Sequence, residues 1–195
     1  MTNARVDITT GFLTGEHVSA SRKLLSQLEG VFQDEKAWQA MDPGTVVYEV
    51  QTHAAVADGT RGGLLFGTSC VMPGKVGSEY FMTRGHFHAQ RESAEYYWCI
   101  QGQGALILMD EQGRTTVEWM SPGSLHYIPG HVAHRLANTG CDVLRVGACW
   151  PSDAGHDYAA ITDGGFTSRL MEVDGKPCLV AAEDTEKQEY ADTLH

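Results

Sequence analysis

The chain has 195 residues, with 14 Lys and Arg against 25 Asp and Glu, and a formal net charge of −11. This length predicts one domain with room for a hydrophobic core, and a hydrophobic share of 42% argues against a disordered chain. The acidic balance argues against nucleic acid or an anionic membrane surface as the main partner, but it leaves a small anionic substrate open.

The cellular setting follows from what the chain lacks. Residues 1–11 have no apolar stretch typical of a signal peptide, and no apolar run approaches the roughly 18 residues of a membrane span. The five cysteines are odd in number and none has C-x-x-C spacing. We therefore expect a cytoplasmic protein whose cysteines are small buried hydrophobes rather than reactive or metal-bound thiols.

The predicted elements change in character near residue 45. Apolar residues at helical spacing, from Leu24 to Phe32, predict a helix over residues 19–32, and a second short helix is expected over 34–41. Short runs rich in Val, Leu and aromatic residues follow, separated by Gly and Pro turns. They predict strands at 45–51, 63–72, 79–88, 94–102, 104–110, 114–120, 124–129, 142–150 and 177–182. This spacing favours an all-β sandwich or barrel.

We expect a single domain over residues 1–195. It consists of an N-terminal helical or extended segment (1–44), a β-barrel (45–182) and an acidic tail (183–195) that forms a last helix or a frayed end.

His86 and His88 give the strongest chemical signal. In a strand, residues two apart point to the same face, so both imidazoles are aimed into one space. Glu95 opens the next strand and can return beside them through a hairpin, and His134 follows much later. Three imidazoles and one carboxylate suit a divalent transition metal with open positions for a substrate. An isolated H-x-H is weak evidence, since surface strands often carry paired histidines.

The surrounding residues resemble the cupin superfamily, whose members are double-stranded β-helix (jelly-roll) barrels with a central metal. Its two motifs correspond to His86, His88, Glu95 and Gly102, and to Gly123, Pro129, His134 and Asn138. Two features depart from the common pattern. Six residues separate His88 from Glu95, and His131 stands where the second motif has Gly.

Side-chain alternation places Tyr97 on the face of Glu95. Its phenol is either a hydrogen-bond donor to substrate or a core ring with a satisfied hydroxyl. His126 and His131 are expected behind the ligands or on the surface.

The sequence between residues 68 and 161 resembles the cupin-type glucose-6-phosphate isomerases known chiefly from archaea. The resemblance rests on the elements G-H-F-H (85–88), A-E-x-Y (94–97), A-H-R (133–135) and A-G-H-D-Y (154–158). The long spacing to Glu95 is typical of this subfamily. Trp150 stands where relatives have a tyrosine. A phenol can donate and accept a hydrogen bond, whereas an indole N–H can only donate, so the contact of this residue with substrate is expected to differ.

The resemblance implies an enzyme of glycolysis and gluconeogenesis, a metal-dependent aldose–ketose isomerase that interconverts glucose 6-phosphate and fructose 6-phosphate. It implies one divalent ion per chain, Fe²⁺ first, with Mn²⁺, Zn²⁺ or Ni²⁺ as alternatives, and a homodimer. The implied metal ligands are His86, His88, Glu95 and His134; the phosphate-binding positions are Ser69, Thr83, Gly85 and Tyr158; the catalytic group around the sugar is Glu95, Tyr97 and His156.

Several alternatives stay open at this level. Lys75 or Arg84 could supply charge to the phosphate, or both could lie on a solvated face. Glu95 could carry a proton between C2 and C1 of the sugar, or the hydrogen could move between these carbons by a metal-assisted hydride shift. Two other functions also fit a metal-binding cupin: an Fe-dependent dioxygenase, and a sugar-binding protein without enzymatic activity.

Overall fold

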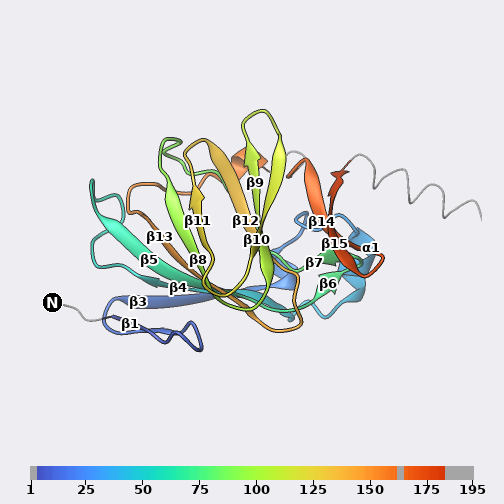
Figure 1. The fold of residues 1–195 in the computed structure, drawn as a ribbon, viewed down its shortest axis with the longest axis horizontal. Helices are drawn as coiled ribbons and strands as arrows, with labels where there is room; N and C mark the ends of the chain where they lie inside the picture. Colours follow the sequence, from blue (N-terminus) through green and yellow to red (C-terminus); the bar gives the residue numbers. More distant parts are fainter. Residues whose placement is uncertain (1–3, 162–164, 183–195) are drawn as a thin grey trace, which may run out of the picture.

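The computed structural model describes residues 4–161 and 165–182, and strands dominate it (Figure 1). The strands are β1 (Arg5–Val6), β2 (Leu13–Thr14), β3 (Val18–Leu24), β4 (Val46–His53), β5 (Leu64–Val71), β6 (Lys75–Val76), β7 (Glu79–Tyr80), β8 (Glu95–Gln101), β9 (Gly104–Asp110), β10 (Thr115–Met120), β11 (Leu125–Ile128), β12 (Val132–Asn138), β13 (Leu144–Pro151), β14 (Ser168–Val173) and β15 (Lys176–Ala181). One α-helix, α1 (Glu35–Ala40), and two 3₁₀ turns (Leu25–Gln27 and Ala159–Ile161) complete the described elements.

Antiparallel pairing connects the strands. Six of them form one sheet in the order β11-β8-β13-β5-β4-β3, and three form a second in the order β10-β9-β12. A third sheet, β15-β14-β7-β6, lies at the end of the molecule where α1 packs (Figure 1). The predicted all-β architecture is confirmed.

The core lies between the sheets. Its fully buried residues include Ile107 on β9, Leu136 on β12 and Val146 on β13, each at most 1% exposed. Burying side chains of this size stabilises the fold by about 1.5–3 kcal/mol each. The packed sheets therefore form a rigid frame that fixes the positions of the polar side chains they carry.

The helix predicted over residues 19–32 is wrong. Residues 18–24 form β3, an edge strand whose side chains are largely exposed and whose backbone pairs with β4. Most of the apolar residues that suggested a helix follow the strand. Leu25 lies in a 3₁₀ turn, Leu28 and Phe32 lie in irregular chain after it, and all three side chains are buried. Pairing with the free edge of β4 supplies backbone hydrogen bonds that the sequence pattern does not reveal.

The second helix is confirmed as α1. Asp34 caps its first turn by accepting a hydrogen bond from the Ala37 N–H at 2.8 Å. The Trp38 indole N–H donates to the Leu25 carbonyl at 3.1 Å and anchors the helix to the chain that precedes it.

The strand predicted over residues 79–88 is only partly correct. β7 ends at Tyr80, and the chain then follows β12 through isolated bridges, with Gly85 at a φ of 77°. That left-handed conformation favours Gly and interrupts the regular alternation. β12, which carries His134, and β14 are two strands that the sequence pattern did not predict.

Burial of the cysteines is mixed. All five are free, and Cys70 and Cys99 are buried as expected, but Cys141 is exposed. The predicted acidic tail, 183–195, lies outside the described residues. Within the described part of the chain, no helix has the length and apolar character required to cross a membrane.

Candidate metal centre and substrate cavity

A backbone bridge brings two distant histidines together. His86 donates its N–H to the carbonyl of His134 at 3.3 Å, and His134 donates back to the carbonyl of His86 at 3.1 Å. Both rings project into the same space, with centroids 4.5 Å apart.

His88 completes a group of three imidazoles. Its ring centroid lies 5.7 Å from that of His86 and 5.2 Å from that of His134. One nitrogen of each ring falls within 4.8 Å of the others, so the three residues could hold a metal ion. His88 and His134 are almost fully buried, which keeps the arrangement rigid.

The Glu95 carboxylate lies beside this group. Its Oε2 atom is 2.9 Å from His88 Nε2 and 3.7 Å from His134 Nε2. Glu95 is 5% exposed and opens β8, where Tyr96 and Trp98 face outward and Cys99 faces inward. The expected alternation is therefore present, with Glu95 directed into the barrel.

The nitrogen atoms test whether a metal fits here. His88 Nδ1 lies 2.8 Å from the Ser93 carbonyl and His134 Nδ1 lies 3.4 Å from the Val132 carbonyl. With Nδ1–H donating to these carbonyls, each ring presents Nε2 to the centre. His86 Nε2 and His134 Nε2 are buried and have no hydrogen-bond partner among the described residues. Buried nitrogens without partners are costly, and a metal ion would satisfy them.

The electrostatics favour the neutral ligand form in two of the three histidines, His86 and His134. Burial, together with the neighbouring imidazoles, holds the pKa of His86 far below its usual value. Burial also lowers the pKa of His134. In His88, burial opposes protonation, but the contacts with Glu95 and the Ser93 carbonyl outweigh it and raise the pKa.

A cavity of about 240 Å³ opens onto the histidines. Every position predicted to contact substrate lines it: Ser69, Thr83, Gly85, Tyr97, His156 and Tyr158. Trp150 also lines the cavity and lies over Gly67, where an added Cβ would come within 2.9 Å of the indole ring. Gly67 thus makes room for Trp150, a pairing that the sequence did not suggest.

Two aromatic hydroxyls and one imidazole surround the open side of the histidine group. Burial raises the pKa of Tyr97 well above its usual value and raises that of Tyr158, so both phenols remain donors at neutral pH. Burial lowers the pKa of His156, whose ring stacks parallel to that of Tyr158 with centroids 5.8 Å apart. The His156 ring is also 4.4 Å from that of His86.

The two cations suggested for a phosphate differ in their placement. Lys75 forms an ion pair with Glu172, with 2.5 Å between Nζ and Oε1, and is not among the cavity residues. Arg84 lines the cavity and lies 5.9 Å from the ring centroid of Tyr158. The Thr83 hydroxyl accepts the Leu136 N–H at 3.0 Å, which leaves its own hydrogen free to donate.

The sequence reasoning missed several cavity residues. Lys23 on β3 and Tyr48 on β4 line the cavity, as does Thr68, whose buried hydroxyl has no partner among the described residues. Lys23 was missed because residues 19–32 were predicted as a helix. Alternation along the strand 45–51 could have suggested Tyr48, whose pKa is raised to about 12 by burial.

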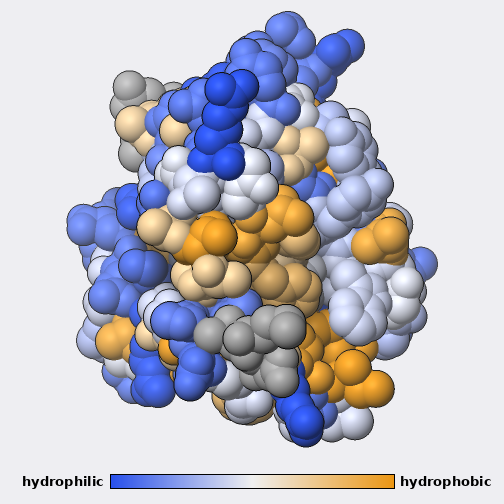
Figure 2. Space-filling view, turned by 90° about the vertical axis from the view of Figure 1, so that its left-hand side faces the viewer, coloured by the Kyte–Doolittle hydropathy of each residue, from blue (hydrophilic) through white to orange (hydrophobic). Residues whose placement is uncertain are grey.

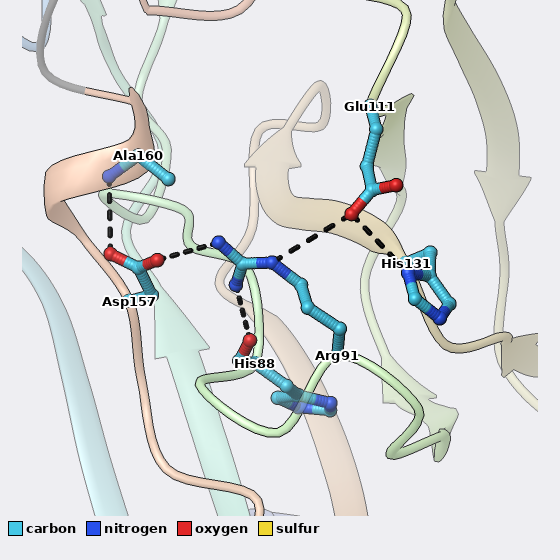
Figure 3. Close-up of polar contacts among 6 residues, drawn as sticks. All are labelled: His88, Arg91, Glu111, His131, Asp157 and Ala160. Carbon is cyan, nitrogen blue, oxygen red and sulfur yellow. Dashed lines mark hydrogen bonds and ion pairs between the residues drawn. The ribbon is translucent and has the colours of Figure 1, made fainter.

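Arg91 ties the His88 loop to the segment that carries His156 and Tyr158 (Figure 3). Its guanidinium donates to the His88 carbonyl and to Asp157 Oδ2, the latter at 2.6 Å, and lies 4.6 Å from the centroid of the Phe87 ring. Asp157 in turn accepts the Ala160 N–H at 3.1 Å.

The remaining motif histidines lie elsewhere. His126 is buried between Glu118 and Ser124, to which its ring nitrogens are bonded at 2.6 and 2.8 Å. His131 is exposed and has a φ of 63°, the left-handed conformation that explains why the common motif has Gly at this position.

Comparisons with known proteins identify the family of the chain. The family model described as "Glucose-6-phosphate isomerase (GPI)" matches residues 22–186. The enzyme named glucose-6-phosphate isomerase from Thermococcus kodakarensis is 42% identical over 180 residues, covering 90% of this chain and 91% of the relative. That from Thermococcus litoralis is 40% identical over 176 residues, covering 88% and 90%.

Similarity to solved structures is weaker. An oxalate decarboxylase from Bacillus subtilis aligns with 56% of this chain and 26% of its own, at 19% identity and a TM-score of 0.43, too low to inform function. The family match and the curated relatives span most of the sequence. The chain belongs to the glucose-6-phosphate isomerase family.

Proposed function

We propose that this protein interconverts glucose 6-phosphate and fructose 6-phosphate with one divalent metal ion, Fe²⁺ in the first instance. The observation that carries the proposal is the group of three histidines, with two unpartnered Nε2 atoms, at a cavity lined by hydroxyl groups. Membership of the isomerase family supports the same substrate pair.

His86, His88, His134 and Glu95 would hold the ion. The donor set of three imidazoles and one carboxylate suits Fe²⁺, and Mn²⁺, Zn²⁺ or Ni²⁺ as alternatives. When bound, the ion supplies Lewis-acid stabilisation of negative charge that develops on the sugar oxygens.

The hydroxyl-lined side of the cavity would bind the phosphate. Ser69, Thr83 and Tyr158 offer hydroxyl donors, Gly85 allows close approach of the backbone, and Arg84 adds positive charge. Donors of this kind hold a phosphate well, especially with a cation beside them. Fixing the phosphate in this way would orient C1 and C2 of the sugar toward the histidines.

Glu95, Tyr97 and His156 would surround the reacting carbons. A carboxylate in this position can take the proton from C2 and return it to C1. The neutral Tyr97 phenol can donate to a sugar oxygen, since burial raises its pKa. Deuterium from D₂O appearing at C2 of glucose 6-phosphate would support proton transfer through Glu95, and complete retention of the original hydrogen would support direct transfer between carbons.

The proposal is tested by metal dependence of turnover. We expect fructose 6-phosphate to be converted by the protein as isolated, activity to fall with chelator, and Fe²⁺ or Mn²⁺ to restore it. His126→Gln provides a control, because His126 is a buried histidine outside the metal group.

Other outcomes would point elsewhere. Lack of turnover of any sugar phosphate by metal-loaded protein would overturn the proposal. Oxygen consumption with a phenolic or thiol substrate would indicate a dioxygenase. A melting shift with sugar phosphate but no product would indicate a sugar-binding protein.

We also propose that the protein is a homodimer. The six-stranded sheet ends in two edge strands, β3 and β11, and edges of this kind are often covered by pairing. Large apolar side chains are exposed at Leu125 (66%) and Tyr127 (52%) on β11. Figure 2 shows an apolar area, bordered by hydrophilic residues, on the side of the molecule that lies at the left in Figure 1. Light scattering that reports only monomer would contradict the dimer.

A further inference from the structure

Arg135 is a buried cation behind the histidine group. It follows His134 on β12, and alternation directs its side chain to the opposite side of the strand. The side chain lies over the ring of Phe166, with Cζ 4.2 Å from the ring centroid, and the residue is 3% exposed.

Two of the three guanidinium nitrogens of Arg135 have no hydrogen-bond partner among the described residues. Its Nε and Nη2 atoms are buried, and no described residue bonds to either. Glu79 is the nearby buried carboxylate, but both of its oxygens are engaged. Oε1 accepts from Arg169 Nη1 at 3.0 Å, and Oε2 accepts the Gln33 N–H at 2.9 Å. Two buried guanidinium groups therefore share one carboxylate.

A buried charge without a partner is expensive. Removing an ion from water is unfavourable unless a counter-charge or hydrogen bonds compensate for the lost hydration. A guanidinium stays protonated in proteins at neutral pH, so Arg135 is a cation. The aromatic contact with Phe166 covers one face of the guanidinium but bonds to none of its N–H groups.

A second cavity, of about 100 Å³, lies against Arg135. Arg84, Gly85 and Tyr158 line it from the side of the substrate cavity, and Phe166 lines it as well. Its volume is less than half that of the substrate cavity, so it suits a small ion rather than a hexose phosphate. Among the described residues that line the cavity, Glu29 is the carboxylate that would oppose an anion.

Gly85 separates the two cavities. A Cβ added to this residue would come within 2.9 Å of the Phe166 ring and 3.0 Å of Arg135 Cβ. An occupant of the second cavity would therefore lie next to the backbone proposed to bind the sugar phosphate.

We propose that the second cavity binds a small tetrahedral oxyanion, such as inorganic phosphate or sulfate, through the guanidinium of Arg135. The planar N–H pairs of a guanidinium match two oxygens of such an anion. This site is separate from the one proposed for the phosphate of the sugar, and its test does not depend on isomerase activity.

Calorimetric titration of the metal-loaded protein with inorganic phosphate tests the site. With the substrate site saturated by sugar phosphate, we expect one saturable site per chain, a loss of affinity of at least tenfold in Arg135→Met, and unchanged affinity in Arg114→Met. Arg114 is a matched control because its exposed guanidinium pairs with Asp110 outside both cavities. Phosphate should still bind when the substrate site is saturated with sugar phosphate.

A second variant covers the case in which Arg135→Met does not fold. Glu29 is exposed, so Glu29→Gln should fold normally and bind phosphate about threefold more tightly, because it removes the opposing charge. Unchanged or weaker binding by this variant would place the ion elsewhere.

Three further results would overturn the proposal. They are absence of phosphate binding to the wild type, equal binding by folded Arg135→Met, and displacement of the phosphate by sugar phosphate. The last result would mean that inorganic phosphate had occupied the substrate site.

Discussion

Arg91 Nη2 and Asp157 Oδ2 lie 2.6 Å apart and join two segments that are distant in sequence. Asp157 stands between His156 and Tyr158, and Arg91 also donates to the carbonyl of His88. The pair thus fixes the cavity residues His156 and Tyr158 relative to the histidine group (Figure 3).

Arg91→Gln should weaken substrate binding. We expect KM for fructose 6-phosphate to rise about tenfold, equivalent to about 1.4 kcal/mol, because His156 and Tyr158 would lose their fixed position. The free energy of unfolding should fall by no more than about 1 kcal/mol, since the pair is partly exposed. Steady-state kinetics measure KM, and metal analysis tests whether the metal is retained. Arg114→Gln is the control for both. A loss of metal with unchanged KM would contradict the assigned role.

Asp157 should make stability depend on acid pH. Its hydrogen bond with Arg91 lowers the pKa of the carboxyl from its usual value. A carboxyl whose pKa is lower in the folded state stabilises the fold above its unfolded pKa of about 4, and this contribution is lost as pH falls through the folded value. Thermal unfolding should show a difference between wild type and Asp157→Asn that is constant above about pH 5 and shrinks in more acidic buffer. A difference that does not change with pH would contradict the linkage.

His134→Gln should remove the metal centre. The side chain is 1% exposed and contacts the rings of His86, His88 and Tyr97. Loss of a ligand should lower metal affinity and turnover by about 100-fold or more, since even groups behind the ligands typically cost 10–100-fold. Metal analysis after dialysis checks this, and His126→Gln should keep its metal. Full metal content in His134→Gln would refute the proposed ligand set.

Lys23→Gln and Lys75→Gln should differ in their effect on substrate binding. Lys23 lines the cavity, whereas Lys75 pairs with Glu172 away from it. Loss of an exposed cation near a phosphate should raise KM about fivefold, or about 1 kcal/mol, for Lys23→Gln. Lys75→Gln should leave KM unchanged. Equal kinetics for the two variants would show that β3 does not contribute to phosphate binding.

His131→Gly should stabilise the protein. His131 has a φ of 63°, and this conformation costs a non-glycine residue about 1–2 kcal/mol. Glycine loses more backbone entropy on folding, so we expect a net gain of about 0.5–1 kcal/mol. Chemical denaturation measures it. His131→Ala keeps the strained backbone and should not be stabilised, so equal gains in both variants would attribute the effect to loss of the imidazole instead.

The residues of the site were predictable where the pattern is local. The spacing of His86 and His88, and the alternation that directs Glu95 and Tyr97 to one face, depend on neighbouring residues alone. The family motifs then indicated His134 and the hydroxyl positions, which the structure places around one cavity.

Other features required the tertiary structure, because they depend on pairing between distant segments. The chain from 18 to 24 is a strand only because the edge of β4 is available, and this brings Lys23 to the cavity. Lys75 and Arg135 are both cations in the sequence, yet Lys75 pairs with Glu172, whereas Arg135 forms no ion pair with any carboxylate of the described residues. Sequence determined which groups can ligate a metal or bind phosphate; long-range packing decided which charges are neutralised and which remain free to bind.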